Sequence, residues 1–432
     1  MIAIIGAGIS GLSLAYFLEK KGIEYQLLEG SERVGGLINS TKIDNYLLET
    51  GPNSILCDEY LIDFLKSLGL EKDFIYPNPA SHNRFIFKNG RYQKLPDNPI
   101  SLLTSSFFSF KTKWAIFSEM RKKAMSIKNE TLSAFFKRRF SQEVVDYALN
   151  PFVSGIYAGN PDKLLLNKTF PNIIEFEQKY GSVLKGFIKN KTGKRKQSLN
   201  FKHGMEQLPI AIAKEIKHIK LNTSVSKIQK NRNQQYIIST NTEEIIADKV
   251  VICTSAKVTS NILRLESPLL AEALQKLDYP PMTAIYSAFK KKDVGFKMEG
   301  FGGLNPKVEN QFSAGSIWTS SIMPERCPED EVLFTSFVGG VQYENNTQFS
   351  DDEIKEKVGL ELMSQYQIKS KPVFQYIKKW PLALPQYTIE LNEVYELIKK
   401  EEASNLFFSA NWNEGVSLGD CIKKGEELSK IL

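Results

Sequence analysis

Cysteine, histidine and long apolar runs are all scarce in this chain of 432 residues. Its four cysteines lie far apart and form no Cys-x-x-Cys pair: Cys57, Cys253, Cys327 and Cys421. That spacing excludes a structural zinc site of the usual kind, so we expect no metal and a reducing compartment, the cytoplasm. The sequence enters a glycine motif within six residues, and we therefore expect no signal peptide. No apolar run approaches the roughly 18 residues of a membrane-spanning helix, so any membrane contact is expected to be peripheral.

The histidines offer no base for a catalytic triad. His82, His203 and His218 all stand in polar contexts, and we expect them at the surface. We therefore predict no catalytic side chain of the nucleophile or base type.

The net charge leaves several partners open. Lys and Arg number 56 against 49 Asp and Glu, a formal charge of +7. This excess of positive charge is compatible with an anionic membrane, an acidic substrate, nucleic acid or no charged partner at all. Nucleic acid is the least favoured, because no basic block with interleaved aromatics stands out. A hydrophobic fraction of 42% and a charged fraction of 24% are those of an ordinary globular protein and exclude disorder.

The sequence does contain a dinucleotide-binding pattern at its start. Residues 2–5 form a short apolar β-branched run, typical of a buried parallel strand, and Gly6-Ala7-Gly8-Ile9-Ser10-Gly11 follows at once. Helical spacing of apolar residues continues to Gly22, and a second strand at residues 25–28 ends at Glu29. A Gly-x-Gly-x-x-Gly turn between such a strand and helix indicates a Rossmann-like unit.

Each position of this pattern has a physical task. Gly6 permits the tight turn, Gly8 lets a pyrophosphate approach the backbone, and Gly11 lets helix and strand pack closely. The helix N-terminus offers unpaired N–H groups to the phosphates. Glu29 is predicted to accept hydrogen bonds from the adenosine ribose hydroxyls.

The next residues decide between NAD and FAD. The segment from Glu29 through Arg33 to Gly35-Gly36-Leu37 resembles the E-x-x-x-R-x-G-G stretch of the large flavoprotein family that includes amine oxidases and phytoene desaturases. The resemblance implies FAD, with this second loop against its phosphates. Glu49-Thr50-Gly51-Pro52 is similar to the family's next element, which passes close to the flavin.

Several distant segments resemble the oxygen-dependent protoporphyrinogen oxidases, a branch that also contains coproporphyrinogen oxidases. The segments are Asn83-Arg84-Phe85-Ile86, residues 151–161, Phe170-Pro171 with Glu177, Arg326-Cys327-Pro328, Trp380-Pro381 with Pro385-Gln386-Tyr387, and residues 415–422. This resemblance implies a six-electron oxidation of a porphyrinogen by FAD, with O2 as electron acceptor and H2O2 as product.

The same resemblance implies roles for individual residues. It places further flavin contacts at Gly51, Pro52, Asn53, Ser54, Val225, Trp380, Val416, Ser417 and Leu418. It assigns Arg84 to a substrate propionate, which a guanidinium can grip with two parallel bonds. Gly155 and Gly159 either let the backbone approach the macrocycle or form plain turns. Thr388 stands near the position where some amine oxidases carry a cysteine linked to FAD, so FAD is expected to be non-covalent.

The predicted fold is α/β and α+β: a Rossmann-like FAD-binding domain with an interleaved antiparallel-sheet substrate domain and a helical insert. We assign residues 1–60, 201–262 and 400–432 to the first, 61–99, 165–200 and 263–399 to the second, and 100–164 to the insert. Residues 219–228 are predicted as one strand and residues from about 421 as a terminal helix, while the basic stretch 189–202 is interpreted as a solvated loop. Eight basic residues crowd the insert beside aromatics, which indicates either a membrane interface or a solvated face: Lys111, Lys113, Arg121, Lys122, Lys123, Lys137, Arg138 and Arg139.

Four functions stay open at this point. Oxidation of protoporphyrinogen is the first hypothesis, and oxidation of coproporphyrinogen on the same scaffold is the second. The third is a flavin amine oxidase, and the fourth is a porphyrin carrier that binds FAD without turnover. A homodimer is compatible with each of them.

Overall fold

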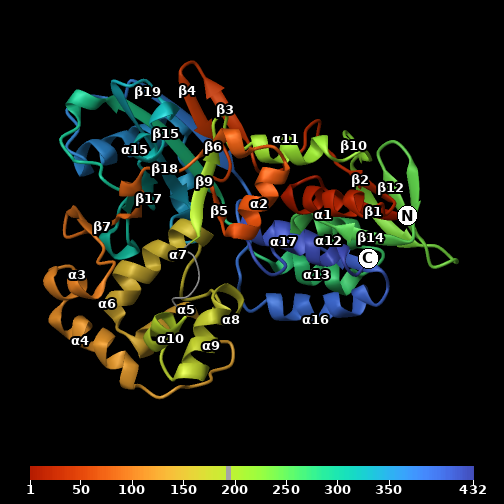
Figure 1. Cartoon of the computed structure of the whole chain (residues 1–432), viewed down its shortest axis with the longest axis horizontal. Coiled ribbons are helices and arrows are strands. Elements are labelled where there is room, and N and C mark those ends of the chain that lie inside the picture. Colours follow the sequence, from red (N-terminus) through yellow and green to blue (C-terminus); the bar gives the residue numbers. More distant parts are fainter. Residues whose placement is uncertain (191–195) are drawn as a thin grey trace.

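A computed structural model describes residues 1–190 and 196–432. Two sheet-containing units lie side by side, and a helical lobe extends from one of them (Figure 1). The first unit is built on a parallel sheet with helices, and the second on a mainly antiparallel sheet. This mixture of α/β and α+β structure confirms the predicted fold class.

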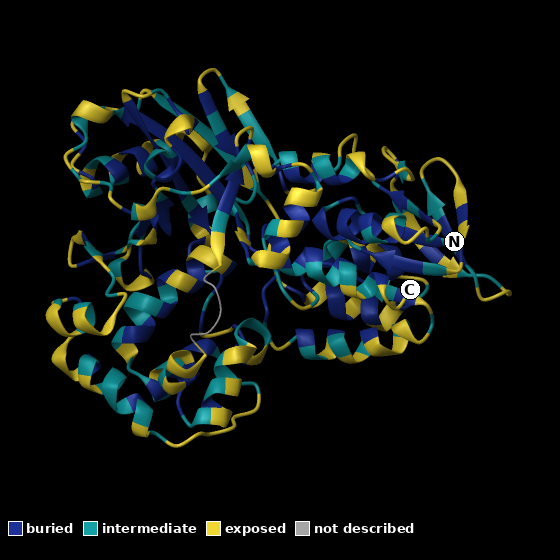
Figure 2. Ribbon diagram, in the orientation of Figure 1, coloured by how far each residue is buried: buried dark blue, intermediate teal, exposed yellow. Residues whose placement is uncertain are grey.

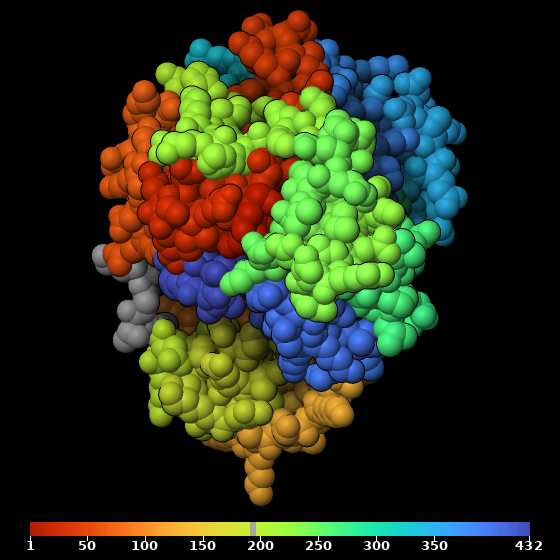
Figure 3. Space-filling model, turned by 90° about the vertical axis from the view of Figure 1, so that its right-hand side faces the viewer, coloured from red at the N-terminus to blue at the C-terminus, as the bar shows by residue number. Residues whose placement is uncertain are grey.

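The nucleotide-binding unit is built on a five-stranded parallel sheet with the order β10-β2-β1-β14-β20. Its strands are β10 (Ile219–Lys220), β2 (Tyr25–Leu28), β1 (Ile2–Ile5), β14 (Lys249–Ile252) and β20 (Leu406–Phe408). β1 and β14 are almost entirely buried, as strands covered on both faces should be. Segments from the start, middle and end of the chain thus share one sheet, and they meet on one face in Figure 3.

Helices cover this sheet. α1 (Ile9–Lys20) follows the glycine turn, and α17 (Leu418–Ser429) packs against it so closely that a Cβ on Gly425 would lie 2.9 Å from the Leu14 nitrogen. Further helices of the unit are α2 (Glu59–Ser67), α11 (Gln207–Lys214), α12 (Ala256–Leu263), α13 (Pro268–Lys276) and α16 (Leu391–Glu402).

Two predicted elements of this unit differ from the structure. The predicted strand 219–228 is divided, because Asn222 adopts a left-handed φ of 51° and turns the chain. Its second half is β11 (Val225–Lys230), which forms a separate antiparallel sheet with β12 (Tyr236–Thr240) and β13 (Glu244–Ala247). The terminal helix begins at Leu418, earlier than predicted, because Ser417 and Asp420 form a capping box.

The second unit holds a seven-stranded sheet with the order β19-β15-β18-β17-β16-β7-β8. The strands are β19 (Phe374–Trp380), β15 (Met282–Lys290), β18 (Glu331–Gly339), β17 (Gly315–Ile317), β16 (Gly302–Leu304), β7 (Arg84–Lys88) and β8 (Arg91–Lys94). Every pair is antiparallel except β7 with β16. α15 (Asp351–Gln365) covers one face, while the hairpin β3 (Ser40–Ile43) and β4 (Tyr46–Glu49) reaches the other, where Tyr46 stacks on Phe374.

A small sheet joins the two units and corrects one prediction. β9 (Gln197–Phe201) pairs with β5 (Ile55–Cys57) and β6 (Phe74–Ile75). Leu199, Asn200 and Phe201 are fully buried, so this part of the predicted solvated loop 189–202 is a core strand. The many basic residues before β9 made the alternation of the apolar Leu199 and Phe201 hard to recognise in the sequence. Residues 191–195 of the predicted loop lie outside the described part of the chain.

The helical lobe runs further along the chain than the predicted insert 100–164. Its main helices are α3 (Pro99–Thr104), α4 (Phe110–Ser118), α5 (Leu132–Arg139), α6 (Gln142–Val144), α7 (Asn150–Tyr157), α8 (Leu166–Thr169), α9 (Pro171–Tyr180) and α10 (Val183–Lys189). The helices α3 and α4 carry much exposed surface (Figure 2). The domain ranges themselves stay predictions.

The basic residues of the lobe do not form one solvated face. Arg139 is 1% exposed and bound to the carboxylates of Glu119 and Glu177. Arg138 forms paired bonds with Glu130 and Glu177. Arg139 is therefore a core ion-pair residue, and Arg138 is a partly buried residue whose guanidinium is paired with two carboxylates.

Candidate cofactor site

The glycine turn has the geometry that the sequence predicts. Gly6 has a φ of 101°, which favours glycine. A Cβ on Gly11 would lie 2.0 Å from the Gly6 carbonyl oxygen, so helix and strand can approach only without a side chain there. A Cβ on Gly8 would meet nothing within 4 Å, so the backbone at Gly8 borders open space. Between them, Ala7, Ile9 and Ser10 are buried, and the turn opens directly into the 12-residue helix α1.

Glu29 ends β2 beside this turn. One oxygen of its carboxylate accepts a hydrogen bond from the Ala7 nitrogen at 2.7 Å. The other accepts bonds from the Ser31 nitrogen at 2.9 Å and hydroxyl at 2.8 Å. The Glu29 carboxylate therefore lies against the glycine turn. If the phosphates of a dinucleotide bind at the turn, the adjoining ribose would lie within reach of this carboxylate.

The second predicted loop lies directly on the first. The Gly35 nitrogen donates to the Ala7 carbonyl at 2.8 Å, and a Cβ on Gly36 would lie 3.2 Å from the Gly8 Cα. The Arg33 guanidinium donates to the carbonyls of Val34, Gly36 and Ile38. Arg33 thus stabilises the conformation of residues 34–38 by binding their own carbonyls. The exposed Leu37 lies within this segment.

The segment from Gly51 to Ser54 packs against that same loop. A Cβ on Gly51 would lie 2.2 Å from the Leu37 carbonyl oxygen, so only glycine fits there. Pro52, Asn53 and Ser54 follow with partly exposed side chains. They lead into β5, which joins this segment to the small sheet.

A buried carboxylate beside this segment escaped the sequence-based site prediction. Glu49 accepts bonds from Ser40 at 2.6 Å, Asn200 at 3.0 Å and the Met205 nitrogen at 3.1 Å, and Arg326 lies 3.4 Å away. Burial raises the pKa of the Glu49 carboxyl despite these partners. The acid directly before Thr50-Gly51-Pro52 was visible in the sequence, but the partners that bury it come from distant segments.

The remaining predicted cofactor residues come from three places. Val416 and Ser417 lead into α17, and Leu418 is its first residue. A Cβ on Gly419 would lie 2.7 Å from a Leu61 methyl group, so this end of α17 borders the start of α2 (Glu59–Ser67). Val225 follows closely on Thr223, whose nitrogen donates to the Glu29 carbonyl at 2.8 Å. Trp380 ends β19 in the second unit, paired with Met282.

These residues fit a dinucleotide. The turn supplies free backbone beside Gly8 at the start of a long helix, and Glu29 supplies an acceptor at the end of β2. The predicted contacts at 51–54, 225 and 416–418 all border the same unit. Trp380 alone comes from the neighbouring sheet.

The predicted substrate residues lie outside this unit. Arg84 is exposed at the start of β7; its guanidinium stacks 4.3 Å from the Phe301 ring centroid and donates to the Ser81 carbonyl. Gly155 is exposed on α7, where a Cβ would lie 3.2 Å from a Leu304 methyl group. Gly159 is buried, and a Cβ there would meet Gln386 and Leu164 at 2.7 and 2.9 Å. Both roles that the sequence left open for Gly159 therefore stay predictions.

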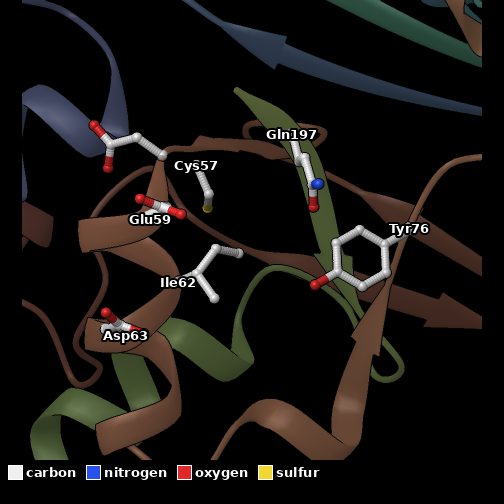
Figure 4. Close-up of a pocket in the computed structure, with 7 residues that line it drawn as sticks. Cys57, Glu59, Ile62, Asp63, Tyr76 and Gln197 are labelled. Carbon is white, nitrogen blue, oxygen red and sulfur yellow. The ribbon is translucent and has the colours of Figure 1, made fainter. Parts of the chain in front are cut away.

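All three histidines are exposed, as predicted. A pocket of about 520 Å³ lies between α2, β5 and β9 and contains none of the predicted site residues (Figure 4). Asp58, Glu59 and Asp63 line it, and Asp58 is bound to the ammonium of Lys423.

Comparison with known proteins places this geometry in a family. Residues 9–430 match the model of the flavin containing amine oxidoreductases. The mitochondrial protoporphyrinogen oxidase of Nicotiana tabacum is 30% identical, over 98% of this chain and 93% of the relative. The coproporphyrinogen III oxidase of Staphylococcus aureus is 29% identical, over 98% and 97%.

Solved structures agree on the fold. A structure from Exiguobacterium sp. superposes with a TM-score of 0.84 at 22% identity, covering 100% of this chain and 98% of that one. Cyclohexylamine oxidase from Brevibacterium oxydans superposes with a TM-score of 0.71 at 16% identity, covering 100% and 98%. Residues 9–430 thus match the family model, and the glycine turn and the second loop packed on it have the geometry of a dinucleotide site. The chain belongs to the flavin-containing amine oxidoreductase family.

Proposed function

We propose that this protein oxidises a porphyrinogen to the porphyrin, using non-covalent FAD and O2 and releasing H2O2. Protoporphyrinogen IX is the first candidate substrate and coproporphyrinogen III the second. The observation that carries the proposal is full-length similarity to oxidases of both substrates. The bacterial coproporphyrinogen III oxidases of S. aureus and Bacillus subtilis, at 29% and 28% identity, keep the second candidate open.

The balance of the reaction needs no strong base on the protein. Removal of six electrons from the macrocycle reduces three O2 to three H2O2. Bound FAD supplies the hydride-accepting chemistry, and aromatisation of the macrocycle drives it. The residues of this chain hold the macrocycle in reach and exclude other paths.

One face of the seven-stranded sheet supports an apolar macrocycle. Paired residues of neighbouring strands point to the same side of a sheet. The register places Arg84, Leu304, Ile317, Phe337, Met282 and Trp380 on the side opposite α15. The apolar members among them are partly buried: Phe337 and Trp380 pack against the cluster around Tyr46, and Leu304 against the cluster around Ile86. The part of these side chains that stays exposed is the surface that we propose for a planar ligand.

This register also limits what Arg84 can contact. β7 and β19 are five strand spacings apart, roughly 24 Å at about 4.8 Å per spacing. Arg84 can therefore bind only propionates on the macrocycle edge that points away from Trp380.

Arg84→Ala is expected to raise KM for the porphyrinogen more than it lowers kcat, because a propionate contact forms in ground and transition states alike. Loss of a charge-assisted bond predicts an increase of roughly tenfold or more. Steady-state kinetics measure this, with Arg91→Ala on the exposed start of β8 as control. A fall in kcat at unchanged KM would remove Arg84 from substrate binding.

The assay of the proposal itself is direct. The purified holoprotein is mixed aerobically with protoporphyrinogen IX, with coproporphyrinogen III and, separately, with a polyamine, and porphyrin fluorescence and peroxide are followed. Faster turnover of one porphyrinogen identifies the substrate. Peroxide from the polyamine alone would favour the amine oxidase hypothesis, and FAD binding without turnover would favour the carrier.

We further propose a peripheral membrane contact through α3 and α4. Four apolar side chains protrude there, and their exposed fractions are 74% for Ile100, 58% for Leu103, 84% for Phe110 and 64% for Trp114. The exposed Lys111 lies among them. Exposed aromatics beside cations are typical of proteins that bind an anionic membrane surface. None of the helices in the described part of the chain is long and apolar enough to cross a bilayer.

Phe110→Ser with Trp114→Ser is expected to reduce binding to anionic lipid vesicles roughly tenfold or more, because two aromatic side chains no longer enter the interface. Vesicle sedimentation with phosphatidylserine-containing and neutral vesicles measures it. Leu269→Ser, an equally exposed apolar residue on α13 with 68% exposure, is the matched control. Equal binding of both variants would exclude this surface.

A further inference from the structure

The loop between β20 and α17, residues 409–417, is held by side chains at four successive carbonyls. Lys424 Nζ donates to the carbonyls of Ala410, at 2.7 Å, and Asn413. The Tyr387 hydroxyl donates to Asn411, and the Tyr395 hydroxyl to Trp412 at 3.5 Å. None of these donors belongs to the loop itself.

The donors converge from three elements. Lys424 comes from α17, Tyr395 from α16, and Tyr387 follows β19 in the second unit. Tyr387 and Trp412 are at most 1% exposed, and the Trp412 indole donates to the Thr254 carbonyl at 3.0 Å. Burial lowers the pKa of Lys424, because removing the ammonium from water disfavours its charged form. The loop is thus fixed on several sides.

The end of this loop sets where α17 begins. Glu414 and Gly415 both have left-handed φ angles, 56° and 98°, and the Glu414 nitrogen donates to the Tyr395 hydroxyl at 3.2 Å. A Cβ on Gly415 would lie 2.7 Å from the Asp420 Cβ. A displacement of residues 410–413 would therefore also move Val416, Ser417 and Leu418 at the start of α17.

Tyr387 also links this loop to the helical lobe. Its ring packs edge-on against Tyr157 of α7 at 6.1 Å, and its carbonyl accepts from the Leu165 nitrogen at 2.9 Å. The Gln386 side chain donates to the Tyr157 carbonyl at 2.8 Å. One residue therefore contacts both the lobe and the loop.

We propose that Tyr387 and Lys424 are positioning residues for the cofactor, which hold the β20–α17 loop so that Val416, Ser417 and Leu418 meet the flavin. The inference rests on the proposed flavin contacts of these three residues. Neither Tyr387 nor Lys424 needs to touch the cofactor. Their loss should weaken FAD binding beyond any effect on the stability of the apoprotein.

Tyr387→Phe tests this with a matched control. Phenylalanine keeps the ring packing and removes only the donor to Asn411. Tyr236→Phe makes the same change in the nucleotide-binding unit, where the Tyr236 hydroxyl donates to the Ser404 carbonyl at 2.8 Å. FAD is titrated into each apoprotein by flavin fluorescence, and the visible spectrum and the thermal midpoint with and without FAD are recorded.

The expected result is a tenfold weaker FAD affinity, about the effect of one lost hydrogen bond, and a shifted flavin spectrum for Tyr387→Phe only. The two variants should lower the apoprotein midpoint by similar amounts. Equal FAD affinity in both variants and the wild type would overturn the proposal.

Lys424→Met provides an independent arm, with Lys423→Met, which removes a partly exposed ammonium from the same helix, as its control. FAD affinity should fall about tenfold to a hundredfold for Lys424→Met and little for Lys423→Met. Lys424→Gln, which keeps amide donors, should recover part of the loss. These titrations contain no porphyrinogen, so they separate the two proposals. A wild-type protein that binds no FAD would contradict the proposed function. A wild type that binds FAD, with the same affinity in the Tyr387 and Lys424 variants, would contradict only the positioning role.

Discussion

Glu29→Ala is expected to yield protein that purifies almost without flavin. The carboxylate supplies the predicted acceptor for the ribose hydroxyls and already binds the Ala7 nitrogen of the glycine turn. Its removal therefore costs a charge-assisted bond to the cofactor and leaves a donor of the turn unpaired. Hydrogen bonds to charged groups contribute about 1.5–3 kcal/mol each, so FAD affinity should fall roughly tenfold to 150-fold.

The measurement is flavin content after purification, followed by titration of FAD into the apoprotein. Glu24→Ala, an exposed acid just before β2, is the matched control and should retain its flavin. Glu29→Gln keeps one acceptor oxygen and should lose less affinity than alanine. Unchanged flavin content in Glu29→Ala would remove Glu29 from the site.

Arg139→Met is expected to destabilise the helical lobe by about 3–5 kcal/mol, because removal of one partner from a buried pair leaves the other charge uncompensated. Arg139 is 1% exposed and donates to Glu119, to Glu177 at 3.1 Å and to the Gly181 carbonyl at 3.0 Å. The bonds join α5 to Glu119 at the end of α4, to Glu177 within α9 and to Gly181 between α9 and α10. Thermal unfolding and proteolysis of residues 99–189 measure the loss.

The pH dependence of this effect has a definite sign. Burial acts to raise the pKa of Glu119, but hydrogen bonds from Ser182 and Arg139 outweigh it and hold that pKa below its usual 4.5. The stability contributed by the ionised Glu119 is present above pH 4.5 and lost as the pH falls below it. Arg139→Met removes one of the groups that favour the ionised Glu119, so the difference in stability between the two proteins should shrink as the solution is acidified.

Arg121→Met is the control for Arg139→Met, because Arg121 belongs to the same lobe and is exposed. It should unfold like the wild type. A variant Arg139→Met that melts and is cleaved like Arg121→Met would show that the buried ion pairs contribute nothing to the lobe.

The basic residues of the lobe show why composition misjudged part of this surface. The sequence indicates surface cations at Arg138 and Arg139, whereas acids from other segments pair with both. Glu130 and Glu177 bind the partly buried Arg138, and Glu119 and Glu177 bind the buried Arg139. The basic stretch before β9 likewise concealed a core strand. The local composition shows which side chains are charged. Whether such a side chain is buried depends on which distant segments pack around it and supply a group of opposite charge.

The glycine turn is the opposite case. The bounds of β1, α1 and β2 and the acid at Glu29 follow from neighbouring residues, because a tight turn, a close helix and a β-branched run are constraints on local backbone geometry. Family resemblance then extended the prediction to FAD and a porphyrinogen.

Long-range pairing decided the rest. It brought strands from residues 219, 249 and 406 into one sheet, placed Arg84 and Trp380 on one face five strands apart, and enclosed the carbonyls of residues 410–413. Such contacts join residues that are hundreds of positions apart, and their free energy comes from burying surface that local sequence does not specify. The residues of the turn could therefore be recognised in the printed sequence, whereas the groups that bind the carbonyls of the β20–α17 loop became visible only when the chain was folded.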